Sequence, residues 1–138
     1  MGLTLIDAGV LVGFLDSNDA HHYAAGRELQ RAQRRGDKLA IPASAFAEAM
    51  VSPSLTGQSA IDTVLEFVDR LPLTVVAFET TIALIAARLR ARHGQKLKLP
   101  DALVVATAIR SEAEILVTTD RGWPSKTHLG FKGQLIRL

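Results

Sequence analysis

Five short stretches typical of β-strands, separated by longer segments with helical patterns, are the feature that most constrains the fold of this chain. They cover residues 3–6, 39–41, 73–78, 115–117 and 134–137. Short runs rich in branched apolar residues are typical of buried strands. Because strands that alternate with helices form βαβ units, this order predicts an α/β fold with a mostly parallel sheet that helices cover on both faces.

The segments between the strands predict six helices. They cover residues 8–15, 22–34, a stretch after residue 44, 59–70, 80–93 and a stretch that residue 101 opens. Gly36 and Gly94 follow two of these helices as C-terminal stop signals. Ser44 is expected to cap the third helix, and Ser52-Pro53-Ser54 with Gly57 is expected to form a loop.

Length and composition predict one folded domain over residues 1–138. Hydrophobic residues make up 48% of the chain, which favours a substantial core over disorder. The 16 basic and 14 acidic side chains give a net charge of only +2, so the overall charge is a weak argument for nucleic acid. The chain has no cysteine, no targeting signal at its start and no apolar run near the ~20 residues that span a bilayer. We therefore expect a cytoplasmic protein without a membrane partner.

Four acidic residues occupy positions where an acid needs an explanation. Asp7 and Asp120 follow predicted strands, whereas Glu48 and Asp101 lie near the starts of predicted helices. The carboxyl ends of parallel strands meet at one edge of a sheet, and folds of this kind bind ligands there. We therefore predict that the four carboxylates converge on one cleft.

Each of the four acids also has an ordinary explanation when it is taken alone. Asp7 and Asp101 suit helix starts, Glu48 suits a helix surface, and Asp120 suits a turn with the two residues after it. Four anions in one cleft would repel strongly, however, and a divalent cation relieves that repulsion. Ligand sets made only of oxygen favour Mg²⁺, with Mn²⁺ as a substitute, and point to phosphodiester cleavage by metal-activated water.

Four ordered motifs surround these acids. They read Leu-Ile-Asp7-Ala-Gly-Val-Leu, Pro-Ala-Ser-Ala-Phe-Ala-Glu48, Leu-Pro-Asp101-Ala-Leu-Val-Val-Ala-Thr-Ala and Leu-Val-Thr118-Thr-Asp120-Arg-Gly-Trp. The set spans nearly the whole chain and resembles PIN-domain ribonucleases, in particular the VapC-type toxins of bacterial toxin–antitoxin pairs. The resemblance implies a PIN-like three-layer α/β/α domain with a five-stranded, mostly parallel sheet.

The resemblance also implies endonucleolytic cleavage of RNA with Mg²⁺ or Mn²⁺. The positions that match the family's catalytic, metal-binding acids are Asp7, Glu48, Asp101 and Asp120. By that resemblance the first three organise the principal ion, the fourth contributes directly or through water, and the products carry 5′-phosphate and 3′-hydroxyl ends. Thr118 falls on a small hydroxyl position beside the last acid. Gly9 departs from the pattern, because many relatives carry Ser, Thr or Asn there, and this removes a secondary polar contact.

A basic run without an intervening acid leads to the predicted site. Its members include Arg88, Arg92, Lys96 and Lys98. The run predicts a path for an RNA backbone, whose contacts with proteins are chiefly through phosphates. A solvated helix end, whose cations complement the helix dipole, explains the same residues equally well. Trp123, just past the last acid, is interpreted as a packing residue.

The apolar helices are first of all core, but some of them exceed what one small domain can bury, which allows a homodimer or a groove for an antitoxin peptide. The antitoxin follows from the resemblance alone. Two other functions stay open: a PIN nuclease that processes RNA outside any toxin–antitoxin pair, and a non-catalytic binding module whose acids hold a structural metal. A phosphatase with an aspartyl nucleophile ranks low, because it usually has a second Asp where Gly9 stands.

Overall fold

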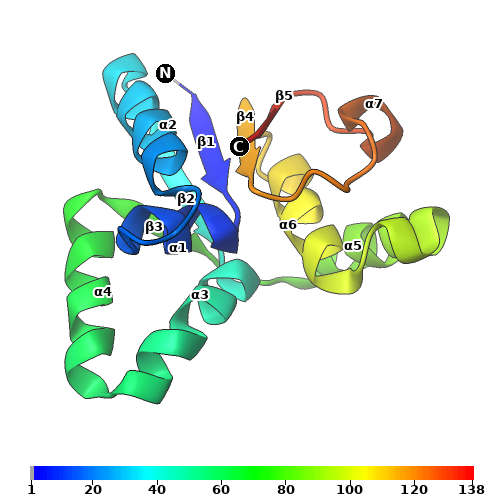
Figure 1. Cartoon of the computed structure of the whole chain (residues 1–138). Coiled ribbons are helices and arrows are strands. Elements are labelled where there is room, and N and C mark those ends of the chain that lie inside the picture. Colours follow the sequence, from blue (N-terminus) through cyan, green and yellow to red (C-terminus); the bar gives the residue numbers. More distant parts are fainter. Residues whose placement is uncertain (1) are drawn as a thin grey trace.

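Five parallel strands form one sheet in the order β3-β2-β1-β4-β5 (Figure 1). The structure is a computed structural model of the chain and describes residues 2–138. The strands are β1 (Leu3–Ile6), β2 (Lys38–Pro42), β3 (Leu73–Val76), β4 (Ile115–Thr118) and β5 (Gln134–Arg137). Every pairing between neighbouring strands is parallel, which confirms the predicted α/β fold with a five-stranded sheet.

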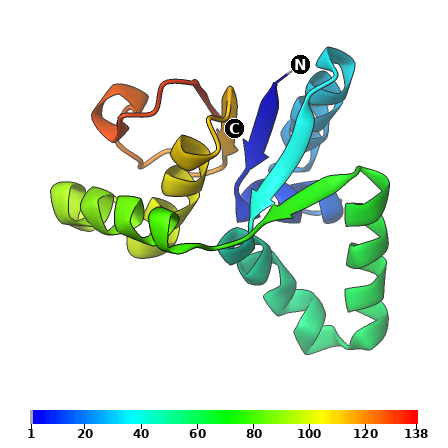
Figure 2. The ribbon, with the colours of Figure 1, turned by 180° about the vertical axis from the view of Figure 1, so that it is seen from behind.

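Helices connect all consecutive strands. They are α1 (Ala8–Leu15), α2 (His22–Arg35), α3 (Ala43–Thr56), α4 (Gln58–Arg70), α5 (Thr80–His93), α6 (Leu99–Arg110) and α7 (Lys126–Leu129), with a 3-10 helix η1 (Gly94–Lys96) before α6. The chain moves along the sheet from β1 to β3 and then returns past β1 to β4. Because crossovers between parallel strands are right-handed, the return through α5 and α6 lies on the other face from α1 and α2. Figure 1 shows α1 and α2 in front of the strands, and in Figure 2, the view from behind, β2 and β3 pass in front of them.

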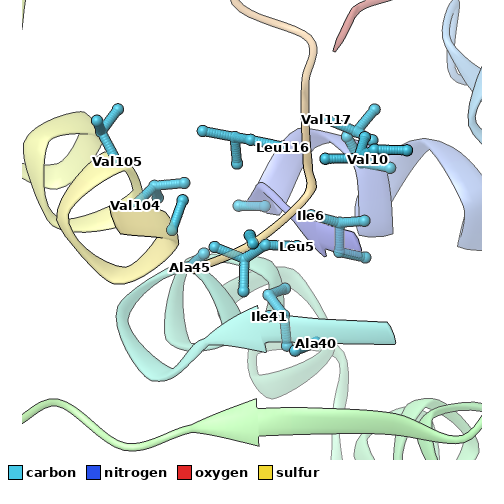
Figure 3. Close-up of a cluster of buried hydrophobic side chains, with 14 of the residues drawn as sticks. Leu5, Ile6, Val10, Ala40, Ile41, Ala45, Val104, Val105, Leu116 and Val117 are labelled. Carbon is cyan, nitrogen blue, oxygen red and sulfur yellow. The ribbon is translucent and has the colours of Figure 1, made fainter. Parts of the chain in front are cut away.

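The core lies around the central strands β1 and β4. Leu5 and Leu116 are fully buried on these strands, and Val105 is fully buried on α6. Figure 3 shows these side chains packed together with Val10 of α1 and Ile41 of β2. Strands that are covered on both faces need continuous apolar runs, and the short runs in the sequence supply them. The central strands are therefore fixed by burial, and their carboxyl ends are fixed with them.

The predicted start of α3 and the loop predicted to follow it are wrong. The helix begins at Ala43, so Pro42 and not Ser44 holds the cap position, without a side-chain hydrogen bond. It then continues through Pro53 to Thr56. The hydroxyl of Ser54 donates to the carbonyl of Met50, one turn back, at 2.7 Å. Serine bonds the helix backbone in this way without ending the helix, so the Ser-Pro-Ser sequence interrupts one backbone hydrogen bond rather than the helix.

The pattern gave no prediction for the short helix α7, and the remaining boundaries agree within two residues. A helix of four residues is too short to show an apolar period. No helix within residues 2–138 has the length and apolar character that crossing a membrane requires. The helices α3 and α4 extend away from the sheet as an open pair (Figures 1 and 2), which leaves part of their surface uncovered.

Candidate active site

Asp7 lies where β1 ends and α1 begins. Its backbone N–H donates to the carbonyl of Val117 on β4 at 3.0 Å, so the neighbouring strand fixes its position. One carboxylate oxygen accepts from the N–H of Ala8 at 2.7 Å, as a helix N-cap does. The other accepts from the hydroxyl of Thr118 at 2.8 Å. The capping explanation of Asp7 therefore holds, yet it accounts for only one of the two oxygens.

Thr118 connects the first acid of the site to the last. Its fully buried hydroxyl donates to Asp7 and accepts from the N–H of Asp120 at 3.0 Å. The carboxylate of Asp120 in turn accepts from the N–H of Gly122 at 2.7 Å, which forms the predicted turn. One hydroxyl thus holds β1 and the segment after β4 together at the carboxyl edge of the sheet.

Asp101 lies in the first turn of α6 and is half-buried. The pKa of its carboxyl is raised to about 6, chiefly by burial and then by the negative charges of Asp7 and Asp120. The indole of Trp123 and the cation of Lys98 act in the opposite direction and lower this pKa. A carboxyl whose pKa responds to two other carboxylates lies within electrostatic range of both.

The environment of Asp7 disfavours its charge in the same way. Only 7% of the residue is exposed, and this burial is the largest cause of its raised pKa. Hydrogen bonds from Thr118 and from the backbone of Ala8 lower the pKa, whereas Glu48 and Asp120 raise it by repulsion. Burial and mutual repulsion therefore act together on the acids at this edge.

Glu48 occupies the second turn of α3 and is exposed. Its charge acts on Asp7, so it belongs to the same electrostatic group. Helix α3 contacts both α1 and α6, which places all three helix starts around the end of β1 (Figure 1). Glu48, Asp101 and Asp120 therefore all lie within electrostatic range of Asp7, with Asp7 innermost and Glu48 at the solvent side.

The chemistry of the four acids suits a divalent cation, whereas their arrangement is open. Within residues 2–138, none of the ion pairs involves any of the four carboxylates. In the same residues, no three acidic or histidine side chains lie close enough together to hold one metal ion as they stand. Carboxylate oxygens are the ligands that Mg²⁺ and Mn²⁺ prefer, and Mg²⁺ usually keeps several waters when only one or two carboxylates bind it. The donor set therefore fits such an ion.

Gly9 makes room for a neighbouring hydroxyl. A Cβ atom built on Gly9 would lie 2.1 Å from Oγ1 of Thr119, closer than any real contact. The side chain of Thr119 thus fills the space beside α1 that a larger residue at position 9 would occupy. The sequence pattern flagged the glycine as a departure but gave no signal for the residue that compensates for its size.

The predicted basic path lies on exposed residues of α5, η1 and the start of α6. Arg88 and Arg92 are one helical turn apart on α5, and Lys96 follows in η1. Lys98 occupies the cap position of α6, and its charge acts on Asp101. The structure therefore brings Lys98 to the acids and places the other three along the chain that leads there.

Comparison with known proteins identifies related sequences and folds. The sequence profile of the PIN domain matches residues 4–129, which is most of the chain. A search among curated proteins finds no match.

Several solved structures share the fold. One is a chain of VapBC2 from Rickettsia felis bound to a DNA fragment from its promoter, with 18% identity, a TM-score of 0.71 and coverage of 99% of this chain and 98% of that chain. Another is a chain of the DNA-bound VapBC of Salmonella typhimurium, with 17% identity, a TM-score of 0.69 and coverage of 99% and 97%. A third, from a toxin–antitoxin complex of Klebsiella pneumoniae, has 23% identity, a TM-score of 0.62 and coverage of 88% and 96%.

Proposed function

The chain belongs to the PIN-domain family, and from this premise we propose that it is a nuclease that cleaves RNA with Mg²⁺ or Mn²⁺ and acts as the toxin of a toxin–antitoxin pair. The observation that carries this proposal is the group of acids at the carboxyl edge of the sheet. Burial and nearby carboxylates raise the pKa values of both Asp7 and Asp101. No cationic side chain within residues 2–138 forms an ion pair with either. Such a group favours binding of a divalent cation.

In this proposal the four acids have distinct tasks. Asp7, Glu48 and Asp101 organise the principal ion, partly through bound water because no three of the acids within residues 2–138 lie close enough together to bind it directly as they stand, and Asp120 contributes directly or through water. Thr118 keeps the carboxylate of Asp7 in one orientation through the 2.8 Å hydrogen bond. A bound divalent ion supplies Lewis acidity toward the scissile phosphate and lowers the pKa of water at the site. The raised carboxyl pKa values mean that this ion competes with protons for the same oxygens.

The exposed cations provide the second part of the proposal, a path for the RNA backbone. Arg88, Arg92, Lys96 and Lys98 are all exposed, and the last of them acts on Asp101. Phosphate contacts of this kind hold RNA without reading its sequence. They would deliver a phosphodiester to the acids from the side of α6.

The toxin role and its partners rest on the neighbours and on exposed apolar surface. The structures that resemble this chain include VapBC complexes and a toxin–antitoxin complex. The open pair α3 and α4 exposes large apolar side chains, among them Leu55 at 84%, Val51 and Phe67. Such a surface favours burial against another protein. We propose a cognate antitoxin and a second copy of the chain as the proteins that bury apolar surface of this kind.

RNA cleavage by the purified protein tests the nuclease proposal. We expect cleavage with Mg²⁺ or Mn²⁺, loss of cleavage with EDTA, and a loss of at least 100-fold in Asp7→Asn and Asp101→Asn. Asp69→Asn on the exposed side of α4 is the matched control and should cleave normally. Circular dichroism should show that all three variants are folded. Folded wild type that cuts none of the transfer, ribosomal and messenger RNAs offered, with either ion, would contradict the nuclease proposal.

Brief induction in cells tests the toxin role. Growth arrest that the Asp101→Asn variant does not cause, and that co-expression of a small gene from directly upstream relieves, is expected of a toxin. Metal-dependent cleavage in vitro without arrest would instead identify an RNA-processing enzyme. Mapping the RNA ends after induction identifies the substrate.

A further inference from the structure

One side chain of the last strand makes three hydrogen bonds to the segment that carries Asp120. The guanidinium of Arg137, on β5, donates to the carbonyl of Trp123 at 2.9 Å, to that of Pro124 at 3.0 Å and to that of Arg121 at 3.1 Å. We call residues 119–125 the acid loop, because Asp120 lies in it. This loop contains no helix or strand, so the three hydrogen bonds replace the partners that regular structure would provide.

The backbone of Arg137 is itself fixed beside the site. It pairs with Thr118 in the register of β4 and β5, and the N–H of Leu138 donates to the carbonyl of Thr118 at 2.9 Å. The hydroxyl of the same threonine bonds both Asp7 and Asp120. Arg137 thus reaches the acid loop from a strand that pairs with Thr118, the residue whose hydroxyl bonds both Asp7 and Asp120.

The acid loop also carries Trp123, whose side chain packs in the hydrophobic core. This residue is 4% exposed, and its ring N–H is buried without a hydrogen-bond partner among residues 2–138. The indole acts on the carboxyl of Asp101, so it lies on the site's side of the loop. A buried donor without a hydrogen-bond partner is costly. The burial of Trp123 in the hydrophobic core confirms its interpretation as a packing residue.

We propose that Arg137 is a positioning residue of the acidic site, which fixes the loop that carries Asp120 by donating to the carbonyls of Arg121, Trp123 and Pro124. It acts through the loop and touches neither substrate nor metal. The proposal rests on the proposed function, since the site it organises is the one assigned there to a divalent ion. Partners behind the direct ligands of a metal orient those ligands, and their loss typically weakens metal binding 10- to 100-fold.

The shape of the guanidinium suits this task. It is planar and presents five N–H groups in a fixed fork, so it can bond several carbonyls on one side at once. An ammonium group in its place is a point donor on a flexible stem, and it can satisfy part of the set at most. A methionine fills a similar volume and donates nothing. Arg137→Lys and Arg137→Met therefore form a graded series.

The test uses the intrinsic fluorescence of Trp123, the only tryptophan of the chain, and the binding of Mn²⁺ alone. Acrylamide quenching of Trp123 reports the order of the acid loop, and electron paramagnetic resonance counts free Mn²⁺ without RNA. In Arg137→Met we expect Mn²⁺ binding to weaken 10- to 100-fold and the quenching constant to rise at least twofold. Arg137→Lys should lie between this variant and wild type. Arg70→Met, at the exposed end of α4, is the control, because α4 packs against α3 and β3 and lies away from the acid loop.

Both Arg137 variants should unfold cooperatively within a few degrees of wild type, which separates positioning from general loss of structure. If Arg137→Met is unfolded, Arg137→Lys alone decides the outcome. Mn²⁺ affinity and quenching within a factor of two of wild type in a folded variant would overturn the proposal. If wild type binds no Mn²⁺, the metal part of the proposed function fails instead, and unchanged quenching in the variants then overturns the role of Arg137 separately.

Discussion

Replacing Asp101 by Asn should stabilise the metal-free protein at neutral pH. The fold raises the pKa of this carboxyl from 3.8 to about 6, because burial and two neighbouring carboxylates disfavour its charge. As the pH rises from about 4 to about 6, the unfolded chain gives up this proton before the native protein does. The native state then binds more protons, so the free energy of unfolding falls across this window and stays reduced above it.

The size of the effect follows from the shift. About two pKa units correspond to about 3 kcal/mol. Solvent around the half-exposed carboxyl screens part of this, so we expect a net gain of about 1–2 kcal/mol in Asp101→Asn at pH 7.5 and none at pH 4. Addition of Mg²⁺ should reverse the order, since an ion at a hundred times its dissociation constant stabilises wild type by about 2.7 kcal/mol and the variant much less.

Urea unfolding at pH 4 and pH 7.5, with EDTA and then with Mg²⁺, measures these differences. Comparing wild type with the variant at each pH cancels the contributions of all other titrating groups. Asp69→Asn, an exposed acid on α4, is the control and should change stability equally at both pH values. A variant that is less stable than wild type at pH 7.5 by the same amount as at pH 4 would refute the electrostatic reasoning.

Three further predictions concern the neighbours of this acid. Thr118→Val should lower the free energy of unfolding by about 1–3 kcal/mol in urea, because it removes the donor to Asp7 and the acceptor for the N–H of Asp120. Thr118→Ser keeps both hydrogen bonds, so equal losses of stability in the two variants would contradict this account. Gly9→Ala should lower the free energy of unfolding by about 1–3 kcal/mol through overpacking against Thr119. Adding Thr119→Ala should recover part of that loss, so strictly additive losses of stability in the double variant would argue against the contact. Mn²⁺ binding measured by titration should weaken as the pH falls below about 6, the raised pKa of Asp101, because protons then compete with the ion for this carboxylate. An affinity that does not change between pH 5 and 7 would exclude Asp101 as a ligand.

Much of the architecture could be predicted from local patterns. The apolar runs that became β1 and β5 and the segments that became α1 and α5 were predicted with the bounds that the structure has. Burial demands a continuous apolar run in a covered strand, and a helix shows its period within three turns, so both signals are local. The loop predicted around Pro53 was wrong, because α3 continues through this proline and loses only one backbone hydrogen bond there.

That the four acids lie near one edge of the sheet could also be predicted, because the carboxyl ends of parallel strands and the starts of the helices that follow them share that edge. The roles of Thr118, Thr119 and Arg137 could not. Each depends on a contact between segments far apart in the chain: a hydroxyl of β4 on an acid after β1, a side chain against a glycine 110 positions earlier, a guanidinium of β5 on a loop. Strand and helix periods say which face a residue takes, but only the packed sheet decides which distant atoms come within hydrogen-bonding distance.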